Sequence, residues 1–68
     1  MLDLHDLSQL SVASIVFDVD QDPWVRGGDD RYHEVEAISE GLPAWGLTPE
    51  ELHEKFGPCT IGWENSNA

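Results

Sequence analysis

The chain of 68 residues carries 14 acidic and three basic side chains, which gives a net charge of −11 at pH 7. A surface with this much negative charge attracts basic partners and repels nucleic acid and anionic membranes. We therefore expect no direct binding to nucleic acid or to a membrane. Hydrophobic residues still make up 40% of the chain, and three residues are Trp. This composition favours a folded domain over a disordered segment.

A chain of this length forms one domain with a thin core, because it buries only about 60% of the surface that its unfolded form exposes. Cys59 is the single cysteine, so an internal disulfide is excluded, which fits a reducing cytoplasm. The first ten residues lack the basic start and apolar run of a signal peptide. No segment reaches the ~20 apolar residues of a membrane span. We expect a cytoplasmic protein with one domain over residues 1–68, of which residues 64–68 form a frayed tail.

Residues 3–10 have the spacing of a short helix. Leu4, Leu7 and Leu10 recur every three positions, and Asp3 can cap the helix start. The alternative is a strand that begins at Leu2 and Leu4.

Residues 12–20, VASIVFDVD, predict a half-buried strand, because they are rich in β-branched residues and alternate in polarity. The alternation places Ile15, Phe17 and Val19 on the buried face and Asp18 and Asp20 on the exposed face. The segment that follows, QDPWVRGGDD at 21–30, contains one Pro and two adjacent Gly residues and predicts a loop.

Residues 31–40 fit two structures. Tyr32, Val35, Ile38 and Leu42 have helical spacing, and Gly41 suits a helix end, so we favour a helix. The same residues could instead form the second strand of a hairpin.

The helix at 49–56 has the clearest local signals. Thr48 suits the N-cap, Pro49 the first helical position and Glu51 the third, which completes a capping box. Gly57 and Pro58 end the helix. Residues 59–63, CTIGW, then predict a closing strand. The fold class expected is α+β, a small domain with two or three strands packed against one or two short helices.

The segment IVFDVDQ at 15–21 resembles the nucleophile motif of haloacid-dehalogenase-type phosphatases. The resemblance implies that Asp18 is the nucleophile and Asp20 the general acid/base. It covers seven residues, and those enzymes need a much larger doubly wound domain with further motifs that this chain lacks. The structural alternative is a strand with an acidic outer face, which we favour.

Two metal motifs are incomplete. Asp18, Asp20 and Asp22 have the spacing of the start of an EF-hand loop, but Pro23 and Asp29 stand where that loop needs Gly and Glu. Glu50 and His53 have the i,i+3 spacing of metal-binding helices but no partner pair. Cys59 lies in an expected strand and is assigned to the core. We therefore predict no metal, no cofactor and no catalytic residue.

The acidic residues are unevenly distributed. Fourteen acids spread evenly give about one charge per 300 Å² of a surface of roughly 4,300 Å², whereas duplex DNA carries about one per 100 Å². Only clustering could imitate DNA, and eight of the acids lie between residues 18 and 40. These are Asp18, Asp20, Asp22, Asp29, Asp30, Glu34, Glu36 and Glu40, interrupted by Arg26 and Arg31.

A binding surface is the function that this pattern predicts. Asp18, Asp20, Asp22, Asp29, Asp30, Glu34 and Glu36 would supply its charge, with Trp24 as an apolar anchor, since Trp is common at interface hot spots. Trp24 could instead fold over the core as a lid.

We expect a non-enzymatic protein that occupies the basic, nucleic-acid-binding surface of a partner, such as a nucleic-acid-handling enzyme or complex. In size and charge the chain resembles small acidic inhibitors encoded by phages and mobile elements. The alternative is an accessory, assembly or antitoxin-like subunit whose acidity serves solubility. A metal- or phosphate-handling enzyme is a more remote alternative.

Overall fold

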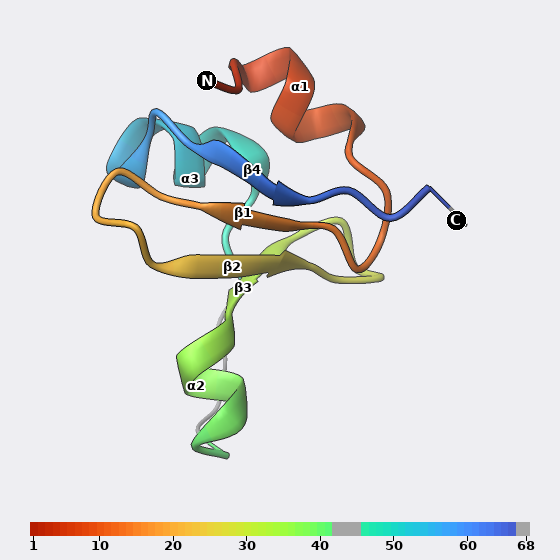
Figure 1. Ribbon diagram of the computed structural model, residues 1–68, viewed down its shortest axis with the longest axis vertical. Coiled ribbons are helices and arrows are strands. Elements are labelled where there is room, and N and C mark those ends of the chain that lie inside the picture. The colour runs from red at the N-terminus through yellow and green to blue at the C-terminus, as the bar shows by residue number, and fades with distance from the viewer. Residues whose placement is uncertain (42–45, 67–68) are drawn as a thin grey trace.

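In the part of the chain that the structure describes, four short antiparallel strands form a sheet in the order β3-β2-β1-β4, and three short helices accompany it (Figure 1). The computed structural model describes residues 1–41 and 46–66. The α+β class is confirmed, with more strands and helices than expected. The elements are α1 (Leu4–Gln9), β1 (Ile15–Phe17), β2 (Pro23–Arg26), β3 (Tyr32–Glu34), α2 (Val35–Ser39), α3 (Pro49–Phe56) and β4 (Thr60–Trp63).

The two helices with capping signals form as expected. In α1 the Asp3 side chain accepts a hydrogen bond from the Asp6 backbone N–H at 2.8 Å, and the Asp6 side chain accepts one from the Asp3 N–H at 3.2 Å. In α3 Thr48 and Glu51 form the same reciprocal pair at 3.2 and 3.0 Å. The helix α3 ends at Phe56, and Gly57 is its C-cap. None of the described helices is long and apolar enough to pass through a membrane.

The strand β1 lies within the expected segment, but the prediction of its buried face was wrong. Val16 and Asp18 are buried, Ile15 and Phe17 are half-buried, and Val19 is exposed. Val16 belongs to the core cluster that also contains Leu7, Trp24, Tyr32, Leu52 and Cys59. Burial does alternate along β1. The helices cover the face that carries Val16, so Val16, rather than Ile15 and Phe17, points into the core.

The prediction of a loop over residues 21–30 was wrong at its centre, where β2 lies. This strand pairs with β1 on one side, Val16 opposite Trp24, and with β3 on the other, Trp24 opposite Glu34. The predicted helix over 31–40 is present only in its second half. Residues 32–34 form β3, so both structures considered for this segment occur, one after the other.

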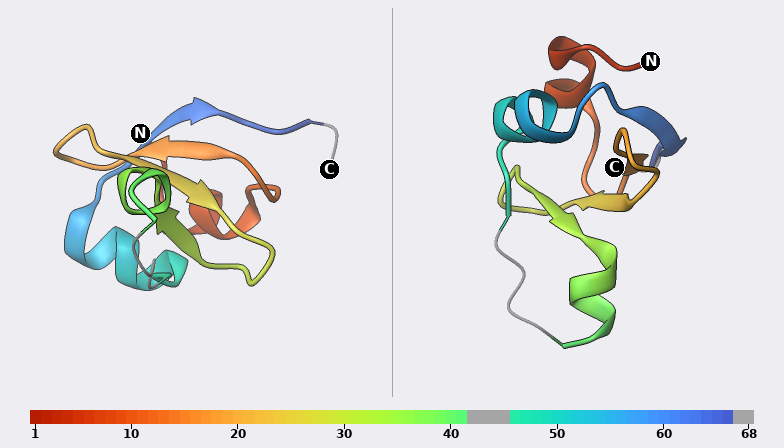
Figure 2. Two further views of the ribbon diagram at one scale, coloured as in Figure 1. Left: turned by 90° about the horizontal axis from the view of Figure 1, so that it is seen from below. Right: turned by 90° about the vertical axis from the view of Figure 1, so that its left-hand side faces the viewer.

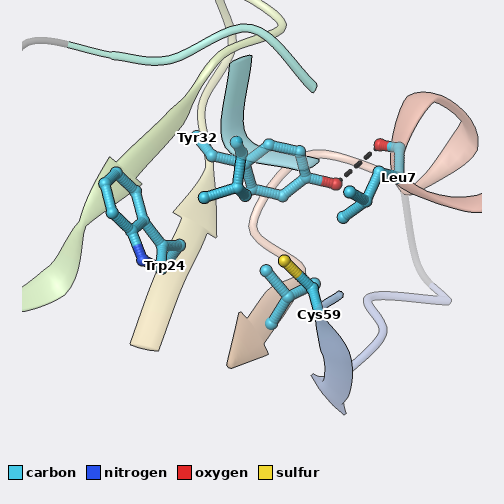
Figure 3. Packing of buried hydrophobic residues seen from close by; sticks show 6 residues of the cluster. Leu7, Trp24, Tyr32 and Cys59 are labelled. Atoms are coloured by element: carbon cyan, nitrogen blue, oxygen red, sulfur yellow. Dashed lines mark hydrogen bonds between the residues drawn. The ribbon is translucent and has the colours of Figure 1, made fainter. Parts of the chain in front are cut away.

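Tyr32 explains the division of that segment. Its ring is fully buried among the other core side chains, and its hydroxyl donates a hydrogen bond of 2.7 Å to the Leu7 carbonyl in α1 (Figure 3). A strand conformation at 32–34 allows this contact while the backbone pairs with β2. The helix α2 then starts at Val35 and extends away from the sheet (Figures 1 and 2).

Cys59 is buried in the core, as expected. The C-terminal segment, in contrast, differs from the predicted frayed tail. The chain is not frayed at Asn65, whose backbone N–H bonds the Ser14 hydroxyl at 3.0 Å and whose side chain bonds the Val12 carbonyl at 3.0 Å. The expectations for Leu42 and for the tail at 67–68 lie outside the described residues.

Candidate functional site

Asp18 is part of the internal structure of the β1–β2 turn. Its side chain is 2% exposed, and it accepts hydrogen bonds from three donors. Oδ1 receives the Asp20 and Asp22 backbone N–H groups at 2.9 and 3.0 Å, and Oδ2 receives the Trp24 indole N–H at 2.9 Å. The expectation that Asp18 contacts a partner was therefore wrong. The nucleophile role implied by the phosphatase resemblance conflicts with the same geometry, because both oxygens are engaged.

Trp24 is also internal. Its side chain is 6% exposed, and its ring centroid lies 5.7 Å from that of Phe56 at the end of α3. The indole covers the core while its N–H bonds Asp18, which is the lid alternative. The expectation of an exposed anchor was wrong, because the indole ring packs against Phe56 and its N–H donates to the buried Asp18 carboxylate.

The three carboxylates of the turn lie close together. Asp18, Asp20 and Asp22 each place an oxygen within 4.8 Å of the others. Oxygen groups of this kind are ligands for hard cations. The Asp18 hydrogen bonds to the backbone of Asp20 and Asp22 account for this proximity without an ion, so the cluster is not assigned a metal.

Asp29 and Asp30 lie in the turn between β2 and β3. The imidazole of His33 lies beside Asp29, and the guanidinium of Arg26 lies beside Asp30. Asp29 lies 3.0 Å from Nε2 of His33 and accepts the Arg31 backbone N–H at 3.1 Å. These hydrogen bonds, that of His33 first, lower the pKa of Asp29. Asp30 lies 3.5 Å from the guanidinium of Arg26.

Both arginines are engaged within the fold. Arg26 is buried, donates to the Leu7 carbonyl at 2.8 Å and lies 5.3 Å from the centroid of the Tyr32 ring. Arg31 donates to the Gly46 carbonyl at 3.1 Å and lies 3.8 Å from a Glu51 oxygen. Neither guanidinium contacts the β1–β2 turn. Lys55, the residue before Phe56, lies nearer to this turn, because the Phe56 carbonyl accepts the Val19 N–H at 2.8 Å, but it forms no ion pair with the described acids.

The sheet separates the expected acidic cluster into two groups. The strand β2, about 13 Å long, connects the turn that holds Asp20 and Asp22 to the turn that holds Asp29 and Asp30. The pairing of Glu34 with Trp24 returns β3 to the first of these ends. We call Asp20, Asp22, Glu34 and Glu36 the acidic end; Asp29 and Asp30 lie at the opposite end.

The acidic end brings four carboxylates to one end of the sheet without a basic partner. Asp20 and Glu36 are exposed, and Asp22 and Glu34 are half-buried. Within residues 1–41 and 46–66, none of the four forms an ion pair. Such an arrangement can attract a cationic surface and raise the rate at which it associates.

A second surface was missed by the sequence analysis. Ile61 and Trp63, in the outermost strand β4, are about half exposed, and a groove lies between β4 and α1. The sequence signal was present, since both residues lie in the expected closing strand, but alternation alone does not reveal whether a strand lies at an edge.

Comparison of the chain with protein-family models, with curated proteins and with solved structures found no match. The charges and surfaces described above are therefore the basis on which a function can be proposed.

Proposed function

We propose that this protein is a non-enzymatic binding module whose acidic end occupies a basic surface of a partner protein, in competition with nucleic acid. The observation that carries the proposal is the grouping of four acids at one end of the sheet, where none of them forms an ion pair with a described residue: Asp20, Asp22, Glu34 and Glu36. Neither the two arginines nor Lys55 forms an ion pair with these four side chains, so this end projects a negative field toward solvent.

The expected partner is a basic nucleic-acid-handling protein of the cytoplasm. Complementary charge acts mainly on the association rate and on the choice of partner. With Asp18 and Trp24 buried, the acidic end lacks a large apolar anchor, so the proposed complex depends strongly on charge and weakens at high salt.

An accessory subunit, docked on its partner through apolar contacts, is the second candidate. The exposed side chains of Ile38, Ile61 and Trp63 favour it. The two candidates differ in salt dependence, because apolar burial is insensitive to charge screening.

The experiment is a capture assay with the immobilised chain in a lysate of its source organism, at low and at high salt. The proposal expects a basic DNA- or RNA-binding protein that is retained at low salt, released at high salt and displaced by added duplex DNA. A partner that stays bound at high salt and is not displaced by DNA would support the accessory subunit instead.

Paired variants locate the contact once the partner is purified. Asp20→Asn with Glu36→Gln removes two charges from the acidic end, and Glu50→Gln with Glu54→Gln removes two exposed charges from α3. The first pair should lower the association rate constant by about threefold or more, and the second pair by much less. Equal losses would show general attraction to a negative protein and would refute the acidic end as the contact.

A further inference from the structure

The outer edge of β4 offers backbone groups for strand pairing. Among the described strands, β4 lies at the end of the sheet and pairs only with β1, on its inner side. On the outer side, the Leu2 N–H donates to the Cys59 carbonyl at 2.8 Å, just before β4 begins. Past that point, no described residue hydrogen-bonds the outer edge of residues 60–64. An edge of this kind can accept an extended segment as an additional strand.

A groove runs beside this edge. It has a volume of about 250 Å³ and lies between β4 and α1, which is drawn beyond β4 on the side away from β1 (Figure 1). Its lining combines apolar with polar or acidic side chains: Leu2, Leu10 and Ile61 with Asp6, Gln9 and Glu64. The groove can therefore hold an apolar side chain close to two carboxylates.

The side chains of β4 are unusual for an unpaired edge. Ile61 is 48% exposed and Trp63 is 52% exposed. Soluble proteins commonly protect edge strands with charged residues or with a bulge. Here the register of β4 with β1 shifts at Gly62, as in a bulge, but no charged residue lies within β4 itself. Two exposed large apolar side chains thus lie on the strand that a pairing segment would join.

We propose that β4 accepts an extended, basic segment of a partner protein as an additional strand. An apolar side chain of that segment would occupy the groove beside Ile61, and Lys or Arg side chains would lie near Asp6 and Glu64. Charge complementarity selects this occupant. A second copy of the chain would bring another net charge of −11 to the same edge. This inference concerns different residues from the acidic end and does not depend on the proposed function.

The probe is a synthetic peptide of alternating Lys and Val, with a second peptide of the same sequence in which every backbone nitrogen is methylated. Methylation keeps the charge and the side chains but removes the N–H groups of both edges of the peptide and crowds both edges. With the ¹⁵N-labelled chain, we expect the unmodified peptide to shift the amide resonances of residues 60–64 and of Leu2, Asp6 and Leu10. It should also slow hydrogen exchange at the outer amides of β4.

The methylated peptide should bind about tenfold or more weakly, because the strand hydrogen bonds are lost. Equal binding of the two peptides, or shifts spread over all exposed acids, would overturn the proposal and leave charge attraction alone. Dimers of the free chain that form through β4 at high salt would overturn it in favour of a second copy.

A matched pair of variants tests the groove. Ile61→Lys introduces a cation at the proposed contact, and Ile38→Lys makes the same change in α2, where the side chain is similarly exposed. We expect Ile61→Lys to weaken the unmodified peptide by about tenfold and Ile38→Lys by less than about twofold. Similar losses in both would contradict the proposal. Asp20→Asn with Glu36→Gln should leave the binding site at β4 in place, so the two proposals can fail independently of each other. If Ile61→Lys does not fold, the comparison of the two peptides on the unaltered chain still tests whether β4 pairs with the added strand.

Discussion

At the scale of single residues, Asp18, Asp20 and Asp22 show how identical side chains acquire different roles. All three follow β1 with i,i+2 spacing, yet Asp18 is buried and the other two face solvent to different degrees. The difference arises because the turn folds its backbone N–H groups back onto the Asp18 carboxylate. A buried carboxylate persists only where such donors compensate for the loss of water.

We predict that Asp18→Asn lowers the free energy of unfolding by about 1–3 kcal/mol. The amide has the same size but only one acceptor oxygen, so its NH₂ group would face either the backbone donors or the Trp24 indole N–H. Urea unfolding of the purified variant measures the change. Asp20→Asn is the control, because its carboxylate is exposed; if both variants unfold alike, the hydrogen bonds of Asp18 do not contribute to stability as described.

At the scale of elements, α3 combines local capping with tertiary contact. Its first turn is fixed by Thr48 and Glu51, while Leu52 is fully buried in the core. The capping contacts connect residues three positions apart, so they operate before the rest of the fold is in place. This explains why the ends of α3 could be predicted closely from the sequence.

Removal of the N-cap should destabilise the domain through this helix. Thr48→Ala deletes the hydroxyl that accepts the Glu51 N–H and should cost about 0.5–2 kcal/mol of unfolding free energy. Glu50→Gln changes an exposed neighbour in the same turn and should cost much less. Thermal or urea unfolding distinguishes them, and equal stabilities would indicate that the helix starts elsewhere.

The capping box also predicts a pH dependence. The hydrogen bond from the Thr48 backbone N–H lowers the pKa of Glu51 below its ordinary value of 4.5. The charged form is therefore favoured in the folded state, and its contribution is present above pH 4.5 and lost as pH falls through the folded pKa. The stability difference between the unaltered chain and Glu51→Gln should shrink over this window. The difference for Glu50→Gln provides the reference, and a Glu51→Gln difference that grows toward acid pH would contradict the assignment.

At the scale of the whole molecule, a net charge of −11 lies on a surface of 4284 Å². The described residues contain two ion pairs of arginine with an acid and one pair of His33 with Asp29, so most carboxylates repel one another without compensation. The fold places Asp29 and Asp30 at the opposite end from Asp20 and Asp22, which spreads this repulsion.

Screening should therefore stabilise the fold. The melting temperature should rise between about 10 mM and about 500 mM NaCl, as the Debye length falls from about 30 Å to a few Å. A scanning calorimetry series measures the trend. KCl should act like NaCl, because the effect is one of ionic strength; a flat or falling melting temperature would show that the acids are stabilised in pairs or by specific ions.

The sequence by itself determined the features that depend on neighbours a few residues apart. Asp3 with Asp6 and Thr48 with Glu51 set the starts of α1 and α3, and the excess of acid over base set the net charge. The α+β class and the closing strand at 59–63 also followed from local composition and alternation.

Only the tertiary structure decided which faces and which charges are buried. The alternation of β1 allowed either face to point inward, and the covering helices selected Val16. A segment with turn residues became β2 because strands on both sides supply its hydrogen bonds. The acids that are close in sequence were separated because β2 extends between them, and burial of Asp18 required Trp24 and the turn backbone to converge on it. Such outcomes depend on contacts between segments that are distant in the sequence. The pattern of neighbouring residues does not specify those contacts.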